Sequence, residues 1–229
     1  MKKALLHTCI FIPAIILAIM VSITGAFAIG EFSIGINGGV TYDPNHLGPY
    51  IDYQNREWKA GGGDASQMDT PYAAVAGFSM RYQFNYFLFR IGFHYATPLQ
   101  DIKGKSDTGF EYTIDTYQAS LPATIGLILP LRKRTYFFLG GGLTYHYAYL
   151  DIDTDEPNKE GRFADAIAGY HFMVGAEVPV TDDITISSEW IHQEGRSIPI
   201  EDDKGSGGKY TINVKGDILL FGINYYISM

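Results

Sequence analysis

Cysteine is almost absent from this chain. Cys9 is the only cysteine among 229 residues, and it lies inside an apolar run near the N-terminus. The rest of the chain can therefore form no disulfide, no zinc–thiolate site and no cysteine nucleophile. A lipid-anchored cysteine would stand at a cleavage point, so Cys9 does not indicate a lipoprotein.

Charged residues are scarce, and positive charge is the minority. Only 18% of the residues are charged, against roughly 25% in an ordinary soluble domain. Lys and Arg number 17 against 25 Asp and Glu, which gives a net charge of −8. A nucleic-acid-binding domain shows the opposite balance, which argues against that class. The surplus residues are Gly, Tyr and Phe, which favour strands and tight turns.

The first 28 residues have the three-part pattern of a secretory signal peptide. A lysine pair precedes an apolar run at 10–23, and residues 26–28 form a small-x-small cleavage site. The alternative is an uncleaved anchor helix, because the apolar run is long for a signal. We expect residues 1–28 to be removed as a signal peptide and residues 29–229 to form one outer-membrane barrel domain.

Long apolar runs are missing after residue 28, where no stretch approaches the ~20 residues of a membrane helix. Apolar residues instead recur at every second position in eight segments. Alternation sustained over about ten residues predicts a strand with one apolar face. The eight segments are 32–42, 72–82, 87–95, 119–129, 137–147, 170–178, 184–190 and 219–229.

The connections between these segments are alternately short and long. Short turns lie at Asn85, at 131–134 and at 181–183. An even number of strands with long connections on one side is typical of an outer-membrane barrel. The sequence leaves open whether the first long connection has structure of its own. The four long connections are polar and together carry a net charge of −8: 43–70, 97–110, 150–163 and 194–208.

The less apolar face of the alternation distinguishes a membrane barrel from a soluble one. This face consists mostly of Gly, Ser, Ala and Thr, which fit the narrow interior of an eight-stranded barrel. The large apolar residues lie on the other face, where water would drive aggregation and hydrocarbon would not. We therefore predict an all-β fold: an eight-stranded antiparallel transmembrane β-barrel with up-and-down topology. A soluble exported barrel or sandwich is the alternative.

With this pattern the chain resembles the small eight-stranded outer-membrane proteins of the OmpX, OmpA membrane-domain and OmpW type. The resemblance implies location in the bacterial cell outer membrane. It also implies a role in membrane integrity, in adhesion or in passage of small hydrophobic molecules. In that family the last strand resembles an assembly signal that usually ends in an aromatic residue, whereas this chain ends in Met. The corresponding residues here are Leu219, Phe221, Ile223, Tyr225, Ile227 and Met229.

Four charged residues fall on the predicted inner face. The phase of alternation places Arg81 and Arg90 on one wall and Glu177 and Glu189 on the opposite wall. An unpaired buried charge costs several kcal/mol, so we predict an Arg/Glu network that fills the lumen. The alternative is that water or backbone satisfies each charge separately. Three histidines are expected above or beside this network: His94, His146 and His171.

Other chemistry has little support in the sequence. The histidines lie on different strands without ligand spacing, so neither a metal site nor a cofactor is expected. A resemblance to lipid-A deacylase barrels would require a His-x-Ser pair plus Glu, and no His here has Ser two positions on. One acidic run departs from the EF-hand pattern at positions 6 and 12, which leaves weak cation binding or a solvated loop. The residues of that run are Asp151, Asp153, Asp155 and Glu156.

These patterns favour a non-catalytic outer-membrane protein with a side-chain-filled lumen, acidic surface loops and a structural or surface-interaction role. The alternatives are a narrow channel for small hydrophobic solutes and a lipid-A-modifying enzyme. A general diffusion porin is disfavoured, because open channels need roughly 16 to 18 strands. The expected partners are outer-membrane lipids, lipopolysaccharide and the barrel-assembly machinery, and the expected state is a monomer that binds no nucleic acid.

Overall fold

The structure is a computed structural model. It describes residues 30–63, 65–132, 134–157, 159–197, 199–201 and 209–227. The predicted signal peptide at 1–28 lies outside the described residues, as does Met229.

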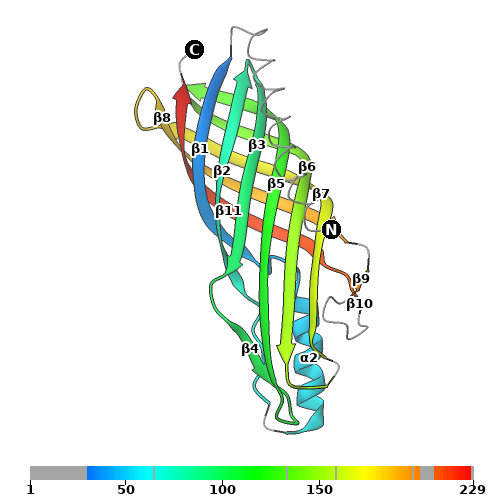
Figure 1. The fold of residues 1–229 in the computed structure, drawn as a ribbon. Helices are drawn as coiled ribbons and strands as arrows, with labels where there is room; N and C mark the ends of the chain where they lie inside the picture. The colour runs from blue at the N-terminus through cyan, green and yellow to red at the C-terminus, as the bar shows by residue number, and fades with distance from the viewer. Residues whose placement is uncertain are drawn as a thin grey trace.

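Eight long antiparallel strands form a closed barrel in up-and-down order (Figure 1), which confirms the predicted fold class. The first long strand pairs with the last, and the third pairs with the fourth to complete the closure. The backbone turns sharply at Asn85, whose φ is 54°, a conformation that Asn tolerates well. The long strands are β1 (Glu31–Tyr42), β2 (Tyr72–Phe84), β3 (Phe87–Pro98), β5 (Glu111–Arg132), β6 (Thr135–Thr154), β7 (Gly161–Pro179), β8 (Ile184–Arg196) and β11 (Asn213–Ile227).

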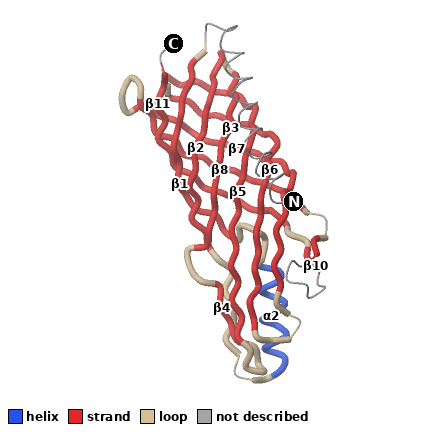
Figure 2. The backbone as a smooth tube through the Cα atoms, viewed as in Figure 1, coloured by secondary structure: helices blue, strands red, loops and turns tan. Residues whose placement is uncertain are grey.

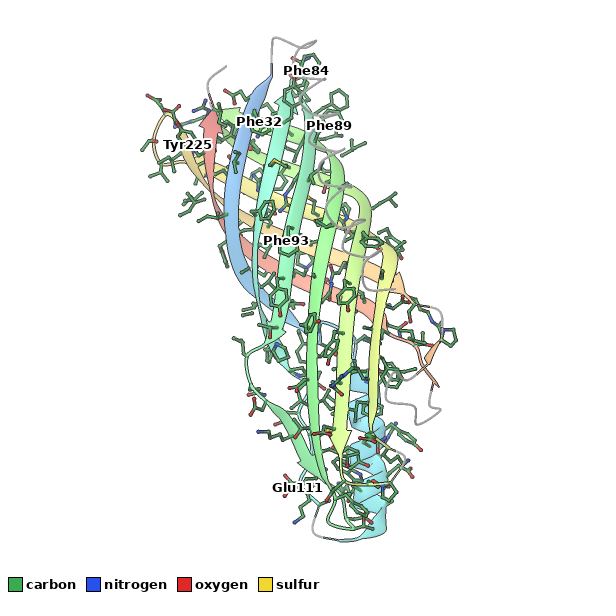
Figure 3. The ribbon with its side chains drawn as sticks, in the orientation of Figure 1. Phe32, Phe84, Phe89, Phe93, Glu111 and Tyr225 are labelled. Atoms are coloured by element: carbon green, nitrogen blue, oxygen red, sulfur yellow. The ribbon has the colours of Figure 1, made fainter. Side chains whose placement is uncertain are left out.

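Large apolar side chains cover the outside of the barrel, whereas the inside combines small and polar residues with a buried apolar cluster that includes Leu88, Met173 and Leu220. Figure 3 shows the rings of Phe89 and Phe93 on the outer surface. Leu143 on β6 is 74% exposed and Ile36 on β1 is 68% exposed. A continuous exposed surface of this kind is stable only against hydrocarbon. We call it the apolar belt, and its members include Ile34, Ile36, Val40, Phe78, Phe89, Ile125, Leu127, Phe137, Leu139, Leu143, Phe172, Val174, Ile186, Trp190, Leu219, Phe221 and Ile223.

Three strands, β5, β6 and β7, continue past the ends of the other strands, on the side opposite the short turns (Figure 2). In this extension the large apolar residues lie on the inner face of the strands, whereas in the apolar belt they lie on the outer face. Ile114 and Ile152 are buried and point inward, while Asp115 and Asp153 are exposed on the outer face. The reversal occurs because water, not hydrocarbon, surrounds the extension. The prediction of a loop from residue 150 was therefore wrong, since β6 continues to Thr154.

Two further predicted loops also contain strands. Within 97–110, β4 (Ile102–Lys105) pairs with the start of β5. Within 194–208, β8 continues to Arg196, and β9 (Ile200–Glu201) pairs with β10 (Lys209–Tyr210) as a separate two-stranded sheet.

The first long connection contains a helix, α2 (Gly48–Gly61), beside the extension (Figure 1). Pro49 stands in its first turn, and Gly62 ends it with φ +76°. The ring of Trp58 lies 4.9 Å from that of Tyr112 on β5. Among the described residues no helix has the length and apolar character needed to cross a membrane. The helix and the extension share one buried cap core: Leu47, Ile51, Trp58, Met68, Ile102, Tyr112, Ile114, Ala148, Leu150, Ile152, Phe163, Ile167, Ile212 and Val214.

Candidate functional site

The structure brings the four predicted inward charges into one ion-pair cluster. Arg81 Nη1 lies 2.5 Å from Glu177 Oε2, and Arg81 Nη2 contacts Glu189 Oε1. Arg90 Nη2 lies 2.9 Å from the other oxygen, Glu189 Oε2. All four residues are no more than 1% exposed. We call Arg81, Arg90, Glu177 and Glu189 the ion-pair cluster.

Each wall of the barrel supplies charges of one sign to this cluster. Arg81 on β2 stands directly opposite Arg90 on β3, so the two guanidinium groups are cross-strand neighbours. Glu177 and Glu189 come from β7 and β8, and Glu189 pairs in the register with Gly175, two residues before Glu177. Like charges side by side on a sheet repel. The arrangement is therefore stable only when the two walls face each other across the lumen.

Neutral polar groups donate further hydrogen bonds to the carboxylate of Glu177. The hydroxyl of Tyr226 donates to Glu177 Oε1 at 2.6 Å, and Thr185 Oγ1 donates to the same oxygen at 2.5 Å. The amide of Asn224 donates to Glu177 Oε2 at 3.3 Å. Tyr136 shares a hydrogen bond of 2.8 Å with Tyr226. Sequence reasoning missed these partners, although the same inward phase on β6, β8 and β11 would have indicated them.

A layer of histidines and hydroxyls lies beside the ion-pair cluster, towards the extension. His171 contacts Thr144 Oγ1 through Nδ1 at 2.7 Å and Thr124 Oγ1 through Nε2 at 2.8 Å. His94 Nε2 lies 3.5 Å from Arg90 Nη2, which links this layer to the cluster. His192, by contrast, faces outward and pairs with Asp217 at 2.8 Å.

One contact in this layer has the form of a nucleophile and its base. Ser120 Oγ lies 2.9 Å from His146 Nδ1, and both residues are buried. The amide of Gln118 lies 3.1 Å from the same nitrogen, where a catalytic triad would place a carboxylate on the opposite side of the imidazole. Among the described residues no carboxylate forms a hydrogen bond to His146. The geometry is that of a packed polar interior.

The predicted acidic run does not come together as a cation site. Asp151 and Asp153 lie on β6 rather than in a loop, and Asp151 Oδ2 accepts from Arg162 Nη2 at 2.6 Å. Glu156 accepts from the hydroxyl of Tyr112, and Asp155 accepts from the backbone N–H of Glu111 at 3.1 Å. The part of the chain that the structure describes contains no group of three or more His, Cys, Asp or Glu able to hold a metal ion.

The predicted assembly strand forms the wall of the barrel next to β1. Its alternate residues face outward and are exposed, and their use as an insertion signal stays a prediction. These described residues are Leu219, Phe221, Ile223, Tyr225 and Ile227.

Aromatic side chains gather where the apolar belt meets the extension. The rings of Tyr42 and Tyr72 lie 5.0 Å apart, and Tyr117 stacks on Tyr149 at 4.7 Å. Tyrosines are typical of the level where hydrocarbon gives way to lipid headgroups. This ring of tyrosines therefore marks the boundary of the membrane at the end that carries the long connections.

No protein-family model matches the chain, and no curated protein matches it in sequence. The crystal structure of Neisserial surface protein A is similar to it, with a TM-score of 0.53, 11% identity and coverage of 85% of this chain and 96% of that chain. A major outer membrane protein from Thermus thermophilus has a TM-score of 0.47, 15% identity and coverage of 86% and 99%. Ail, the attachment invasion locus protein of Yersinia pestis, has a TM-score of 0.46, 12% identity and coverage of 87% and 99%. The likeness to Neisserial surface protein A establishes the fold, and the fold with its apolar belt is that of a small outer-membrane β-barrel protein.

Proposed function

We propose that this protein is a non-catalytic outer-membrane barrel that supports the membrane and presents an extracellular surface, and that its lumen conducts nothing. The observation that carries the proposal is that the interior is filled at two levels in series. The ion-pair cluster and buried apolar side chains such as Met173 and Leu220 fill the barrel, and the cap core fills the extension.

The ion-pair cluster is a poor path for ions or solutes. An eight-stranded barrel has an interior just wide enough for its own side chains. The four charged side chains reach across it from both walls, and Tyr226 and Asn224 fill the remaining sides. A solute could pass only by separating buried ion pairs, which costs several kcal/mol.

The extension supplies the extracellular surface in this proposal. Since β5, β6 and β7 rise beyond the tyrosine ring, their outer faces meet water rather than lipid. Exposed acidic residues such as Asp115 and Asp153 lie on those faces. A surface of this kind favours a basic partner.

A narrow channel for small hydrophobic solutes is the second candidate, because the interior of the extension is apolar. That space is occupied by α2, whose Ile51 and Trp58 are no more than 4% exposed. Passage would require the helix to leave the cap core and the ion-pair cluster to open as well. The filled interior therefore favours the non-conducting role.

Planar-bilayer recording with two kinds of variant tests this proposal. One variant carries Arg90→Ser and Glu189→Ser together, which removes one charge of each sign. A second replaces residues 45–69 with a Gly/Ser linker, and a third combines both changes. We expect no steady conductance from either single change, because the other level stays filled, and we expect any conductance to be greatest in the combined variant. A heat-dependent shift in gel mobility verifies that each variant has folded.

Two results would contradict the proposal. The first is steady conductance from the unmodified protein. The second is faster uptake of a fluorescent apolar solute into liposomes that contain it than into empty liposomes, which would favour the channel.

A further inference from the structure

The outer surface of β7, β8 and β11 changes from apolar to charged within one step along the strands. Trp190 on β8 and Leu219 on β11 stand opposite each other and end the apolar belt on this side. The next outward pair is His192 and Asp217, whose side chains contact each other at 2.8 Å. Each step of two residues advances about 6.6 Å along a strand. The residues beyond this pair therefore stand at the depth of the lipid headgroups.

A surface pocket of about 520 Å³ opens at this depth. It is bounded by the ends of β8 and β11, by β7 and by the turn that precedes α2. Its polar lining residues are His46, Tyr170, Glu194, Arg196, Asn213 and Lys215.

The charges in this pocket leave an excess of positive groups. Glu194 accepts a hydrogen bond from the hydroxyl of Tyr170, and its other oxygen lies 3.5 Å from Lys215 Nζ. The single carboxylate is thus already engaged by two donors. Arg196 stands opposite Asn213 in the register, and among the described residues no carboxylate makes an ion pair with it. The lining therefore carries two cations and one carboxylate, an excess of one positive charge, next to the paired side chains of His192 and Asp217.

We propose that this pocket binds the phosphate monoester headgroup of an anionic outer-leaflet lipid. The guanidinium of Arg196 and the ammonium of Lys215 supply charge-assisted hydrogen bonds to phosphate oxygens, and the amide of Asn213 adds a neutral donor. A lipid is favoured over free phosphate because the pocket opens directly above the apolar belt. The acyl chains of a lipid held there would lie against Trp190 and Leu219. The inference goes beyond the proposed function, since it requires only that the barrel spans a membrane.

Nanodiscs of phosphatidylcholine, with or without phosphatidic acid, provide the test. Phosphatidic acid carries a phosphate monoester headgroup, and binding should raise the thermal unfolding midpoint of the unmodified protein. We expect the double variant Arg196→Gln/Lys215→Gln to lose most of this rise. The matched control is Lys59→Gln/Lys105→Gln, which removes two exposed cations beyond the membrane and should keep the rise. Equal loss in both variants, or retention in the first, would overturn the assignment.

Two further arms make the result specific. Glu194→Gln removes the carboxylate that competes with phosphate, so we expect a lower phosphatidic acid fraction to give the half-maximal rise. An unchanged or higher fraction contradicts the site, and this variant remains informative even if the double variant does not fold. Inorganic phosphate added to phosphatidylcholine nanodiscs should leave the midpoint unchanged. If it reproduces the full rise, the ligand is a free anion and the lipid assignment is wrong.

Discussion

Glu189 lies between two guanidinium groups, those of Arg81 and Arg90, and is 1% exposed. The change Glu189→Gln leaves two buried cations to share the single carboxylate of Glu177. Because breaking a buried ion pair from one side leaves a charge without compensation, we expect a loss of about 3–5 kcal/mol in the free energy of unfolding. Urea titration of the protein in detergent micelles, followed by gel mobility, measures it.

The control for this prediction is an ion pair at the short-turn end. Glu31 is about half exposed and lies 3.3 Å from Arg134. Glu31→Gln should change the free energy of unfolding by no more than about 1 kcal/mol, because Glu31 is half exposed and Arg134 keeps its contact with Asp183. Similar losses from both variants would show that burial of the ion-pair cluster contributes nothing to stability.

Asp43 holds the turn that leads from β1 into α2. Its two carboxylate oxygens accept from the backbone N–H groups of Leu47 and Gly48, the second at 2.9 Å. Burial raises the pKa of this carboxyl above its usual value, although these hydrogen bonds and His46 oppose the shift. The folded protein therefore binds a proton here more tightly than the unfolded chain does.

The stability of the cap core should depend on pH accordingly. As pH falls from the raised pKa of Asp43 towards the ordinary 3.8, the folded form takes up a proton first, so the free energy of unfolding rises. Asp43→Asn should abolish this rise, because an amide does not titrate. Urea titrations at several pH values, read by Trp58 emission in a Trp190→Phe background, measure the difference. Parallel pH profiles for the two proteins would contradict the assignment.

Sequence reasoning could place the members of the ion-pair cluster but not all of their contacts. The phase of alternation alone puts Arg81 and Glu177 inside the barrel. It does not give the stagger between strands, and that stagger decides which inward groups meet. The contact of Tyr226 with Glu177 depends on the register of β11 with β8 and of β8 with β7, which no local pattern specifies.

At the scale of elements, the alternation of apolar and polar residues extends beyond the segments that were predicted as strands. Residues 150–154 alternate in the same way as a strand, with Leu150 and Ile152 as the apolar members. Their phase is opposite to that of the apolar belt, so the segment resembles a polar loop when only outward apolar residues are sought. The reversal of phase marks the level where β6 leaves the membrane. The first long connection carries no such pattern, and its helix forms against a surface that only the folded extension provides.

The helix α2 depends on packing rather than on its own propensity. Trp58 is 4% exposed within the cap core, whereas Tyr53 on the same helix is 52% exposed. We expect Trp58→Ala to lower the free energy of local unfolding of α2 by about 3–5 kcal/mol, and Tyr53→Ala to change it little. Hydrogen exchange of the helix amides, measured by mass spectrometry, reports this local stability. Equal exchange in both variants would mean that the helix does not depend on the cap core.

For the whole molecule, the closed barrel divides into levels with different interiors. The ion-pair cluster and the histidine layer lie inside the apolar belt, and the cap core lies inside the extension. Inside the membrane, charged side chains pair across the narrow lumen beside a buried apolar cluster that includes Met173 and Leu220, while other large apolar side chains face the hydrocarbon. Outside the membrane the exposed face is polar, and the apolar residues of the extension pack inward against α2. The barrel with eight strands was therefore predictable from the sequence, whereas the greater length of β5, β6 and β7 was not.

The placement of the belt in hydrocarbon can be tested at its centre. Leu143 is 74% exposed midway along the apolar part of β6. Leu143→Arg puts a charge at the level of the acyl chains, so we expect the free energy of folding into vesicles to become less favourable by ~2–4 kcal/mol. Tyr53→Arg, on the water-exposed face of α2, should have almost no effect. A barrel whose outer face met water would be stabilised or unchanged by the first substitution, so refolding yields that are equal for both variants would place the belt outside the membrane.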